Sequence, residues 1–147
     1  MTNVLPSGLA RPTPSPDGLD APYWEGTRAR ELRVQRCATC GTFRWSPEWL
    51  CYLCHSFAVD WPRVEPTGVL FSFQRIWHPV APALADAVPY ITVLVELPQA
   101  GGIRMLGNYA GASTDELHIG TPMTAVFESH DAHVRGTDEP YTLVHWR

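Results

Sequence analysis

Apolar and polar residues alternate in several segments of this chain, a pattern typical of β-strands with one buried face. In residues 31–36, Leu32 and Val34 alternate with Arg33 and Gln35, which predicts a first short strand. A dense β-branched run inside Tyr90–Leu97 suits a central strand of a sheet. The pattern predicts five strands in the second half of the chain: 68–77, 90–97, 103–109, 123–128 and 141–146.

The connections between these strands indicate a small barrel. Residues 98–102 read as a hairpin connection, and Ser113–Glu116 fits the capping box of a single helical turn that Gly120 would close. Five strands with one helical turn before the fourth fit an OB-type barrel better than a sandwich, which usually needs seven or more. We therefore expect a mainly β protein whose five-stranded OB-fold barrel occupies residues 61–147.

The N-terminal third has a different character. Residues 1–19 contain four prolines with interleaved Ser, Thr and Gly, which predicts a flexible arm, either a free tail or a segment that orders on a partner. Residues 20–35 read as a helical lead-in, with Asp20 as the N-cap, Pro22 in the first turn and Gly26 limiting the helix. Tyr23 and Trp24 need burial against the rest of the chain or a second chain, and we predict that they bind a partner.

The segment between the first two barrel strands, residues 78–89, is almost uncharged and apolar, which is unusual for a loop. It either folds back onto the core or forms a surface for a ligand or partner. We predict that Trp77 and His78, where the strand meets this loop, also bind a partner.

All four cysteines lie between residues 36 and 60, as Cys37-x-x-Cys40 and Cys51-x-x-Cys54. Two such pairs separated by a short spacer supply four thiolates, and Zn²⁺ prefers four soft ligands in a tetrahedron. The residue after each second cysteine must accept unusual backbone angles, which Gly41 does readily and His55 less so. The spacing predicts a zinc ribbon whose closed coordination sphere gives the metal a structural role.

Other uses of these cysteines remain open at this point. Two disulfides would need an oxidising compartment, whereas the chain opens without a basic-then-apolar leader, so we expect the cytoplasm. A redox role would need a pair at the start of a helix in a βαβ unit. Cys51-x-x-Cys54-His55 also matches a c-type haem attachment pattern, and a rubredoxin-type iron site is available to four thiolates.

The overall charge disfavours nucleic acid and anionic membranes as partners. The net charge is −4, all 11 basic residues are arginines, and no run approaches the 18 apolar residues of a transmembrane span. An apolar content of 45% is enough for a globular core.

Few other residues suggest catalysis. His130, Asp131 and His133 could form a metal or acid–base cluster, but the polar sequence that follows favours a solvated loop. Isolated histidines such as His118 and His145 are typical of surface or hydrogen-bonded positions. Glu96, inside an apolar strand, needs a partner, and Arg104 across the predicted hairpin can supply it.

A more specific pattern emerges when several segments are taken together. These are Leu32-x-x-x-Arg36-Cys37-x-x-Cys40-Gly41, the second cysteine pair and the barrel segments around 89–97 and 117–120. This combination of ribbon and barrel, over residues 20–146, resembles the acyl-CoA-associated zinc-ribbon and OB-fold family (domain of unknown function 35). His55 departs from the smaller residue that often stands there in such ribbons.

The resemblance implies a non-catalytic accessory subunit that binds a thiolase-like or lipid-transfer-protein-like enzyme. Such enzymes include thiolases and retro-aldolases acting on steroid or other side-chain acyl-CoA thioesters, and the accessory subunit would assist binding or passage of the acyl-CoA. It also implies that Cys37, Cys40, Cys51 and Cys54 ligate Zn²⁺. The alternative is a single-stranded nucleic-acid-binding protein in which Phe71, Phe73, Trp77 and Tyr109 stack on bases, although the lack of lysine disfavours it.

Overall fold

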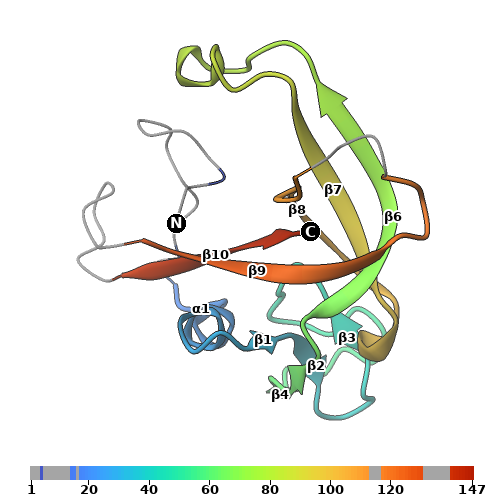
Figure 1. Cartoon of the computed structure of the whole chain (residues 1–147). Helices are drawn as coiled ribbons and strands as arrows, with labels where there is room; N and C mark the ends of the chain where they lie inside the picture. Colours follow the sequence, from blue (N-terminus) through green and yellow to red (C-terminus); the bar gives the residue numbers. More distant parts are fainter. Residues whose placement is uncertain (1–3, 5–13, 16, 113–116, 131–139) are drawn as a thin grey trace.

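The described part of the chain forms a short α-helix, a small N-terminal β region and a five-stranded sheet that curls into a barrel (Figure 1). This computed structural model describes residues 4, 14–15, 17–112, 117–130 and 140–147. Its helical elements are α1 (Ala21–Arg28), η1 (Pro82–Leu84) and η2 (Pro98–Ala100). Its strands are β1 (Leu32–Arg33), β2 (Gln35–Cys37), β3 (Phe43–Arg44), β4 (Val59–Asp60), β5 (Arg63–Val64), β6 (Thr67–Ile76), β7 (Tyr90–Leu97), β8 (Ile103–Asn108), β9 (Pro122–His130) and β10 (Tyr141–Trp146).

The barrel sheet has the strand order β10-β9-β6-β7-β8, with antiparallel neighbours. Its two edges meet where Tyr109 forms a bridge with Trp146 and the Ala110 N–H donates to the Trp146 carbonyl at 2.7 Å. The first residues of β6, Thr67 to Val69, pair with β9, and Val69 to Ile76 pair with β7, which lets one strand turn the corner of the barrel. The prediction of a mainly β protein with a nearly closed five-stranded OB barrel is confirmed.

A β-bulge in β6 changes which residues share a face. The register shifts between Leu70 and Ser72, so that Leu70 lies opposite Val95 while Phe73 lies opposite Val93. Val93 and Val95 both point into the barrel and have no exposed surface. Simple alternation puts Leu70 and Phe73 on opposite faces, but the extra residue of the bulge brings them to the same one.

Helix α1 lies where the sequence indicates, but two of its details differ from the prediction. Asp20 makes no side-chain cap, because its carboxylate accepts from the Ser15 N–H at 3.0 Å and from the Trp24 indole N–H at 2.8 Å. Gly26 does not limit the helix, which continues to Arg28. A Cβ at Gly26 would lie 2.9 Å from Cγ of Arg33, so glycine allows β1 to pack closely on the helix.

Tyr23 and Trp24 are buried inside the chain itself. The Tyr23 ring lies 4.8 Å from the Trp45 ring, and Trp24 meets Tyr141 of the barrel edge-on at 6.4 Å. The aromatic rings of helix α1 therefore pack between the ribbon and β10. Their predicted contact with a partner stays a prediction.

The N-terminal β region consists of two small sheets, β1–β5 and β3–β2–β4, at the end of the barrel opposite the 78–89 loop (Figure 1). The predicted strand at 31–36 is split into β1 and β2, with Val34 between them. Gln35, which alternation assigns to the polar face, is fully buried and lies opposite Arg44.

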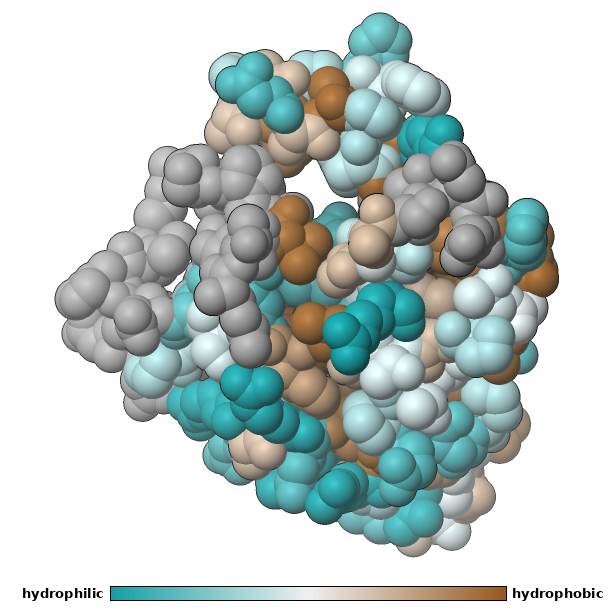
Figure 2. All heavy atoms as spheres, in the orientation of Figure 1, coloured by the Kyte–Doolittle hydropathy of each residue, from teal (hydrophilic) through white to brown (hydrophobic). Residues whose placement is uncertain are grey.

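The 78–89 loop projects from the barrel as a separate lobe (Figures 1 and 2). Leu84 is buried but is not part of the barrel's core cluster, and Val80 is exposed, so within the described residues the loop does not fold back onto the core. The predicted helical turn at 113–116 and most of the 1–19 arm lie outside the described residues. Of the helices in the described ranges, none is long and apolar enough to cross a membrane.

Candidate functional site

The four cysteine side chains converge on one point in the ribbon. Their Sγ atoms all lie within 4.8 Å of one another, with 3.5 Å between Cys37 and Cys54 and 3.7 Å between Cys40 and Cys51. A tetrahedral Zn²⁺ with Zn–S bonds of about 2.3 Å requires S···S separations of about 3.8 Å. The sulfurs are thus already spaced for a tetrahedral metal ion.

The two cysteine pairs are held by the same backbone turn. The N–H groups of Gly41 and His55 donate to the carbonyls of Cys37 and Cys51, each at 2.9 Å. Gly41 and His55 both adopt positive φ angles, +78° and +58°. The left-handed conformation expected after each second cysteine is therefore present in both turns, and His55 adopts it despite its side chain.

Each turn is closed a second time by a strand-like hydrogen bond. The N–H of Cys37 donates to the Thr42 carbonyl and that of Cys51 to the Ser56 carbonyl, both at 2.9 Å. The first cysteine of each pair is buried and the second is exposed. The centre is thus a pseudo-symmetric pair of knuckles that present one buried and one exposed sulfur each.

The surroundings affect the thiol pKa values in ways that suit a cation. Hydrogen bonds from the Thr42 side chain and backbone lower the pKa of Cys40 to about 6. The Ser56 N–H favours the Cys54 thiolate, but partial desolvation of the sulfur and the other three sulfurs raise the pKa of Cys54 to about 12. A bound divalent ion removes the repulsion that opposes the last thiolate, so this donor set fits a metal.

The alternative uses of the cysteines do not fit this geometry. A disulfide needs an S–S distance of about 2.05 Å, and all four cysteines are free. Haem attachment to Cys51 and Cys54 would leave the first pair unused, whereas all four sulfurs form one cluster. Four thiolates complete the coordination sphere of Zn²⁺ and leave no position for water or substrate, so the metal is structural.

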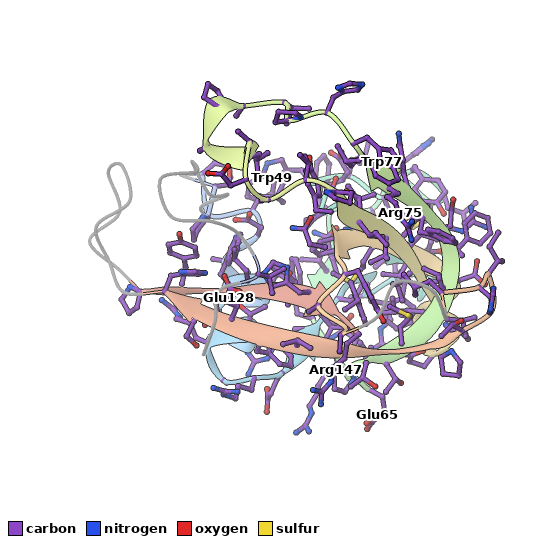
Figure 3. All side chains as sticks on the ribbon, turned by 45° about the horizontal axis from the view of Figure 1, so that its top comes forward. Trp49, Glu65, Arg75, Trp77, Glu128 and Arg147 are labelled. Carbon is purple, nitrogen blue, oxygen red and sulfur yellow. The ribbon has the colours of Figure 1, made fainter. Side chains whose placement is uncertain are left out.

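Of the predicted partner-binding residues, Trp77 and His78 are on the surface. Trp77 is 62% exposed, and the Arg75 guanidinium lies 5.8 Å from the centre of its ring at the end of β6 (Figure 3). His78 is also exposed. The structure thus leaves Trp77 and His78 accessible at the base of the lobe, while Tyr23 and Trp24 lie at the other end of the barrel.

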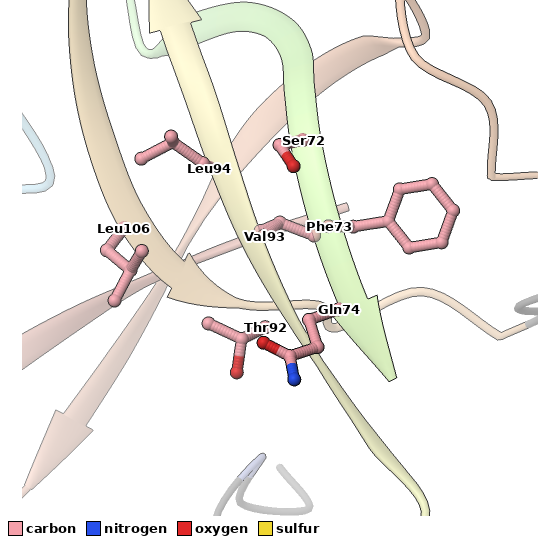
Figure 4. Close-up of a pocket in the computed structure, with 7 residues that line it drawn as sticks. All are labelled: Ser72, Phe73, Gln74, Thr92, Val93, Leu94 and Leu106. Atoms are coloured by element: carbon pink, nitrogen blue, oxygen red, sulfur yellow. The ribbon is translucent and has the colours of Figure 1, made fainter. Parts of the chain in front are cut away.

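The outer face of β6, β7 and β8 carries a hollow of about 490 Å³ (Figure 4). Ser72 pairs with Leu94 and Gln74 with Thr92, so these four side chains share the outer face, and Leu106 completes the wall. The hollow mixes apolar and polar side chains and contains no charged group in its lining.

The predicted pair of Glu96 and Arg104 is present beside this hollow. They lie opposite each other on β7 and β8 with Arg104 Nε 3.1 Å from the Glu96 carboxylate. The Arg104 guanidinium also covers the Phe71 ring at 3.5 Å. Glu96 therefore has an ion-pair partner.

The aromatic residues considered for base stacking do not form one platform. Arg104 covers Phe71 on the outer face, while Phe73 lies opposite the inward-pointing Val93. Tyr109 is half-buried at the seam where the barrel closes. The geometry gives no support to a stacking groove for single strands.

A buried acid–base group near the seam of β9 and β10 was missed by the sequence analysis. Glu128 Oε1 lies 2.8 Å from His130 Nε2, and Glu128 Oε2 lies 3.6 Å from His145 Nε2. His130 also stacks on the Tyr141 ring at 5.1 Å, and the Val4 N–H donates to Glu128. Figure 3 shows Glu128 on its strand.

The prediction that His130 belongs to a solvated loop is wrong, because His130 is the last residue of β9 and is buried. Asp131 and His133 lie outside the described residues. The period-two spacing of Glu128 and His130 could have placed both on the inner face of a strand, but strand alternation was predicted only as far as Glu128.

The ribbon and the barrel each match a family model. Residues 24–60 match the ChsH2 rubredoxin-like zinc ribbon domain, and residues 61–128 match the ChsH2 C-terminal OB-fold domain. The zinc ribbon model and the clustered cysteines agree on a structural zinc site.

Two curated relatives extend well beyond this chain. A probable enoyl-CoA hydratase alpha subunit of Thermomonospora curvata is 38% identical over 124 residues. The 3-oxo-4,17-pregnadiene-20-carboxyl-CoA hydratase alpha subunit of Mycobacterium tuberculosis is 34% identical over 122 residues. Each alignment covers 83% of this chain, which spans only 37% of the length of either relative.

Solved structures have the same arrangement of ribbon and barrel. A chain of an Ltp2–ChsH2 (DUF35) aldolase superposes with a TM-score of 0.72 and 31% identity, covering 93% of this chain and 98% of that one. A DUF35 protein of unknown function from Sulfolobus solfataricus superposes with a TM-score of 0.52 at 18% identity, over 77% and 78% of the two chains, which shows a shared fold. This chain belongs to the DUF35 family of ChsH2-type zinc-ribbon and OB-fold proteins.

Proposed function

We propose that this chain is a non-catalytic accessory subunit that binds a thiolase-like enzyme of the lipid-transfer-protein type and assists it in handling an acyl-CoA thioester. The observation that carries the proposal is the match to the aldolase chain, which extends over 98% of that chain at 31% identity. A similarity of this extent includes the ribbon, the helix and the barrel together.

The chemistry of the described residues supports an accessory role. The metal centre is closed by four sulfurs and has no position for a substrate. Glu128 and His130 form an acid–base pair, but both are buried, and the contacts described for them are to each other, to Tyr141, to His145 and to the backbone of Val4.

The surface supports binding to a partner. Large apolar side chains are exposed at several places, among them the base of the lobe and the ribbon, and such surfaces are the kind that proteins use for association. The exposed members are Trp77 and Val80 in the first group and Trp49, Leu50, Tyr52, Leu53 and Phe57 in the second.

The acyl-CoA part of the proposal draws on the relatives. One relative is named for a pregnadiene carboxyl-CoA, a CoA thioester with a steroid acyl group, and the other for enoyl-CoA. We propose a large apolar acyl-CoA, such as a steroid side-chain thioester, as the substrate class of the partner enzyme.

The names of the curated relatives suggest hydration of an enoyl-CoA as a second activity. This chain corresponds to 37% of each of those proteins, and the matched domains here are a ribbon and a barrel. We propose that the hydratase chemistry resides in the part of those relatives that this chain does not match.

The experiment compares three preparations: the zinc-loaded chain alone, a lipid-transfer-protein-like thiolase alone, and the two co-expressed. We expect a stable complex in which acyl-CoA turnover exceeds that of the thiolase alone, and no turnover by the isolated chain. Recovery of two separate proteins, or turnover by the isolated chain, would contradict the proposal.

A further inference from the structure

The ribbon contains a buried arginine without a partner. Arg44, on β3, is only 3% exposed, and its Nε and both terminal nitrogens make no hydrogen bond to any described residue. Its cross-strand neighbour Gln35 is buried too, but the Gln35 side-chain oxygen accepts from the Glu48 N–H at 3.0 Å. Arg44 is thus the unsatisfied member of a buried polar pair.

Such an arginine is costly to a folded protein. A guanidinium stays charged in proteins and carries five N–H donors. Burying it without an anion loses the solvation of the charge and gains nothing in return, which is why buried charges are nearly always paired. Because no described residue pairs with Arg44, we look for its anion outside the described part of the chain.

A pocket at the junction of ribbon and barrel lies against Arg44, and because the guanidinium nitrogens themselves are enclosed, an anion in the pocket reaches them when side chains of the pocket wall move aside. The pocket measures about 390 Å³ and is lined by Arg44 together with residues of β3, of the following loop and of β8: Phe43, Trp45, Ser46, Glu48, Tyr52 and Ile103. Glu48 is exposed, and the structure records no ion pair between it and Arg44.

The pocket suits a carboxylate better than a phosphate. One guanidinium and the Ser46 hydroxyl match a single negative charge, and the Glu48 carboxylate in the wall disfavours a dianion. A phosphate site usually combines several cations or backbone N–H groups.

The surroundings of the pocket suit a protein as the source of that carboxylate. Tyr52 in the wall is 70% exposed, and its neighbours Leu53 and Trp49 are exposed as well. An arginine in a desolvated pocket among aromatic and aliphatic side chains is the usual composition of a binding hot spot.

We propose that the ribbon face centred on Arg44 is a docking surface, and that an acidic side chain of the partner enzyme enters the pocket and pairs with Arg44. This inference rests on the proposed function, because it identifies how the chain would hold its partner. The ribbon then has a role beyond carrying the metal.

The test uses Arg44→Met in the full zinc-loaded chain, with the stability of the free chain and the Kd of the complex both measured. Because methionine fills similar space without an unpaired charge, we expect the free variant to melt at a higher temperature than wild type. We also expect the Kd for the partner to rise about tenfold or more, because the partner's carboxylate is left unpaired.

Three control variants separate this role from a structural one. Arg36→Met removes a half-buried ribbon arginine that is already paired with Asp60, and should leave the Kd unchanged. Arg44→Lys keeps the charge but loses the planar fork, so its Kd should fall between wild type and Arg44→Met. Glu48→Gln removes a competing carboxylate and should maintain or strengthen binding.

Two results would overturn the inference while leaving the proposed function intact. One is a complex that forms normally while Arg44→Met lowers the melting temperature and leaves the Kd unchanged, which is the behaviour of a structural arginine. The other is binding of inorganic phosphate to the isolated chain that Arg44→Met abolishes, which would assign the pocket to a small anion. If wild type forms no complex at all, the proposed function itself fails.

Discussion

The ribbon and the barrel reach a folded state by different means. The ribbon strands β1 to β5 are two or three residues long, and its buried side chains include the polar Gln35 and Arg44. The barrel strands are six to ten residues long and enclose a continuous apolar core. The barrel is thus stabilised by packing, whereas the ribbon, which adds Leu32, Val34 and Val64 to the same core, also depends on four sulfurs around one ion.

The largest effect expected from this contrast is in the metal centre. Cys51→Ser removes a buried sulfur ligand, so we expect the chain to lose its zinc and the ribbon to lose its structure. Structural zinc in small modules contributes about 10–16 kcal/mol of apparent binding free energy near pH 7. Elemental analysis and the thermal unfolding curve measure the loss, and unchanged stability would refute the structural role of the metal.

His55→Gly is the matched control in the same knuckle. It replaces a residue with a φ of +58° by one that adopts this conformation without strain. We expect the variant to retain its zinc and to be at least as stable as wild type. Loss of metal in this variant would mean that the His55 side chain, and not only its backbone, supports the centre.

An intermediate effect is expected in the barrel, where a pair of leucines provides the contrast. Leu97 is fully buried at the end of β7, and Leu106 on β8 is 69% exposed. Leu97→Ala should lower the free energy of unfolding by about 2–5 kcal/mol, because it leaves a cavity. Leu106→Ala should change it by less than about 0.5 kcal/mol.

Denaturant titration of both leucine variants, with zinc content measured in parallel, tests the independence of the two regions. We expect both variants to bind zinc as wild type does. Loss of zinc in Leu97→Ala would show that the ribbon cannot hold its ion without an intact barrel. The ribbon and the barrel would then not be stabilised independently.

The smallest effect is expected at Tyr23, between the two regions. Burial, with a further contribution from the Asp20 carboxylate, raises the pKa of the Tyr23 hydroxyl above its ordinary value. A phenol with a raised folded-state pKa contributes its full stability below about pH 10 and loses it as the pH rises further. Relative to Tyr23→Phe, wild type should therefore lose about 1 kcal/mol by pH 11.

Parallel unfolding curves of wild type and Tyr23→Phe at pH 8 and pH 11 measure that difference. If both proteins lose the same stability between the two pH values, the Tyr23 hydroxyl is not sequestered between ribbon and barrel as the structure has it.

Much of this architecture follows from local patterns. The β-branched run of β7 and the exact repeat of Cys-x-x-Cys each specify their structure within a few residues, so the strand and the metal ligands could be predicted. The pairing of Glu96 with Arg104 also follows from the short hairpin between their strands, whose connection fixes the register.

The remaining features depend on contacts that are distant in sequence. The β-bulge after Leu70 lies at the bend where β6 changes its pairing partner from β9 to β7. No local sequence feature there predicts the bulge. A glycine stands at position 26 because Arg33 packs closely against it. Arg44 lies opposite the buried Gln35 across the strand pair, which sequence alternation does not reveal. Glu128 and His145 meet only because β9 and β10 pair, so alternation alone could not bring them together.

In the proposed function this chain works as part of a larger enzyme, and its ribbon carries a structural zinc. Gentle purification of the chain from its own cell, followed by native mass spectrometry, measures its partner and its metal together. We expect one zinc per chain and a second polypeptide of the thiolase type in the same particle. A lone chain, a particle containing nucleic acid, or a chain without metal would contradict this expectation.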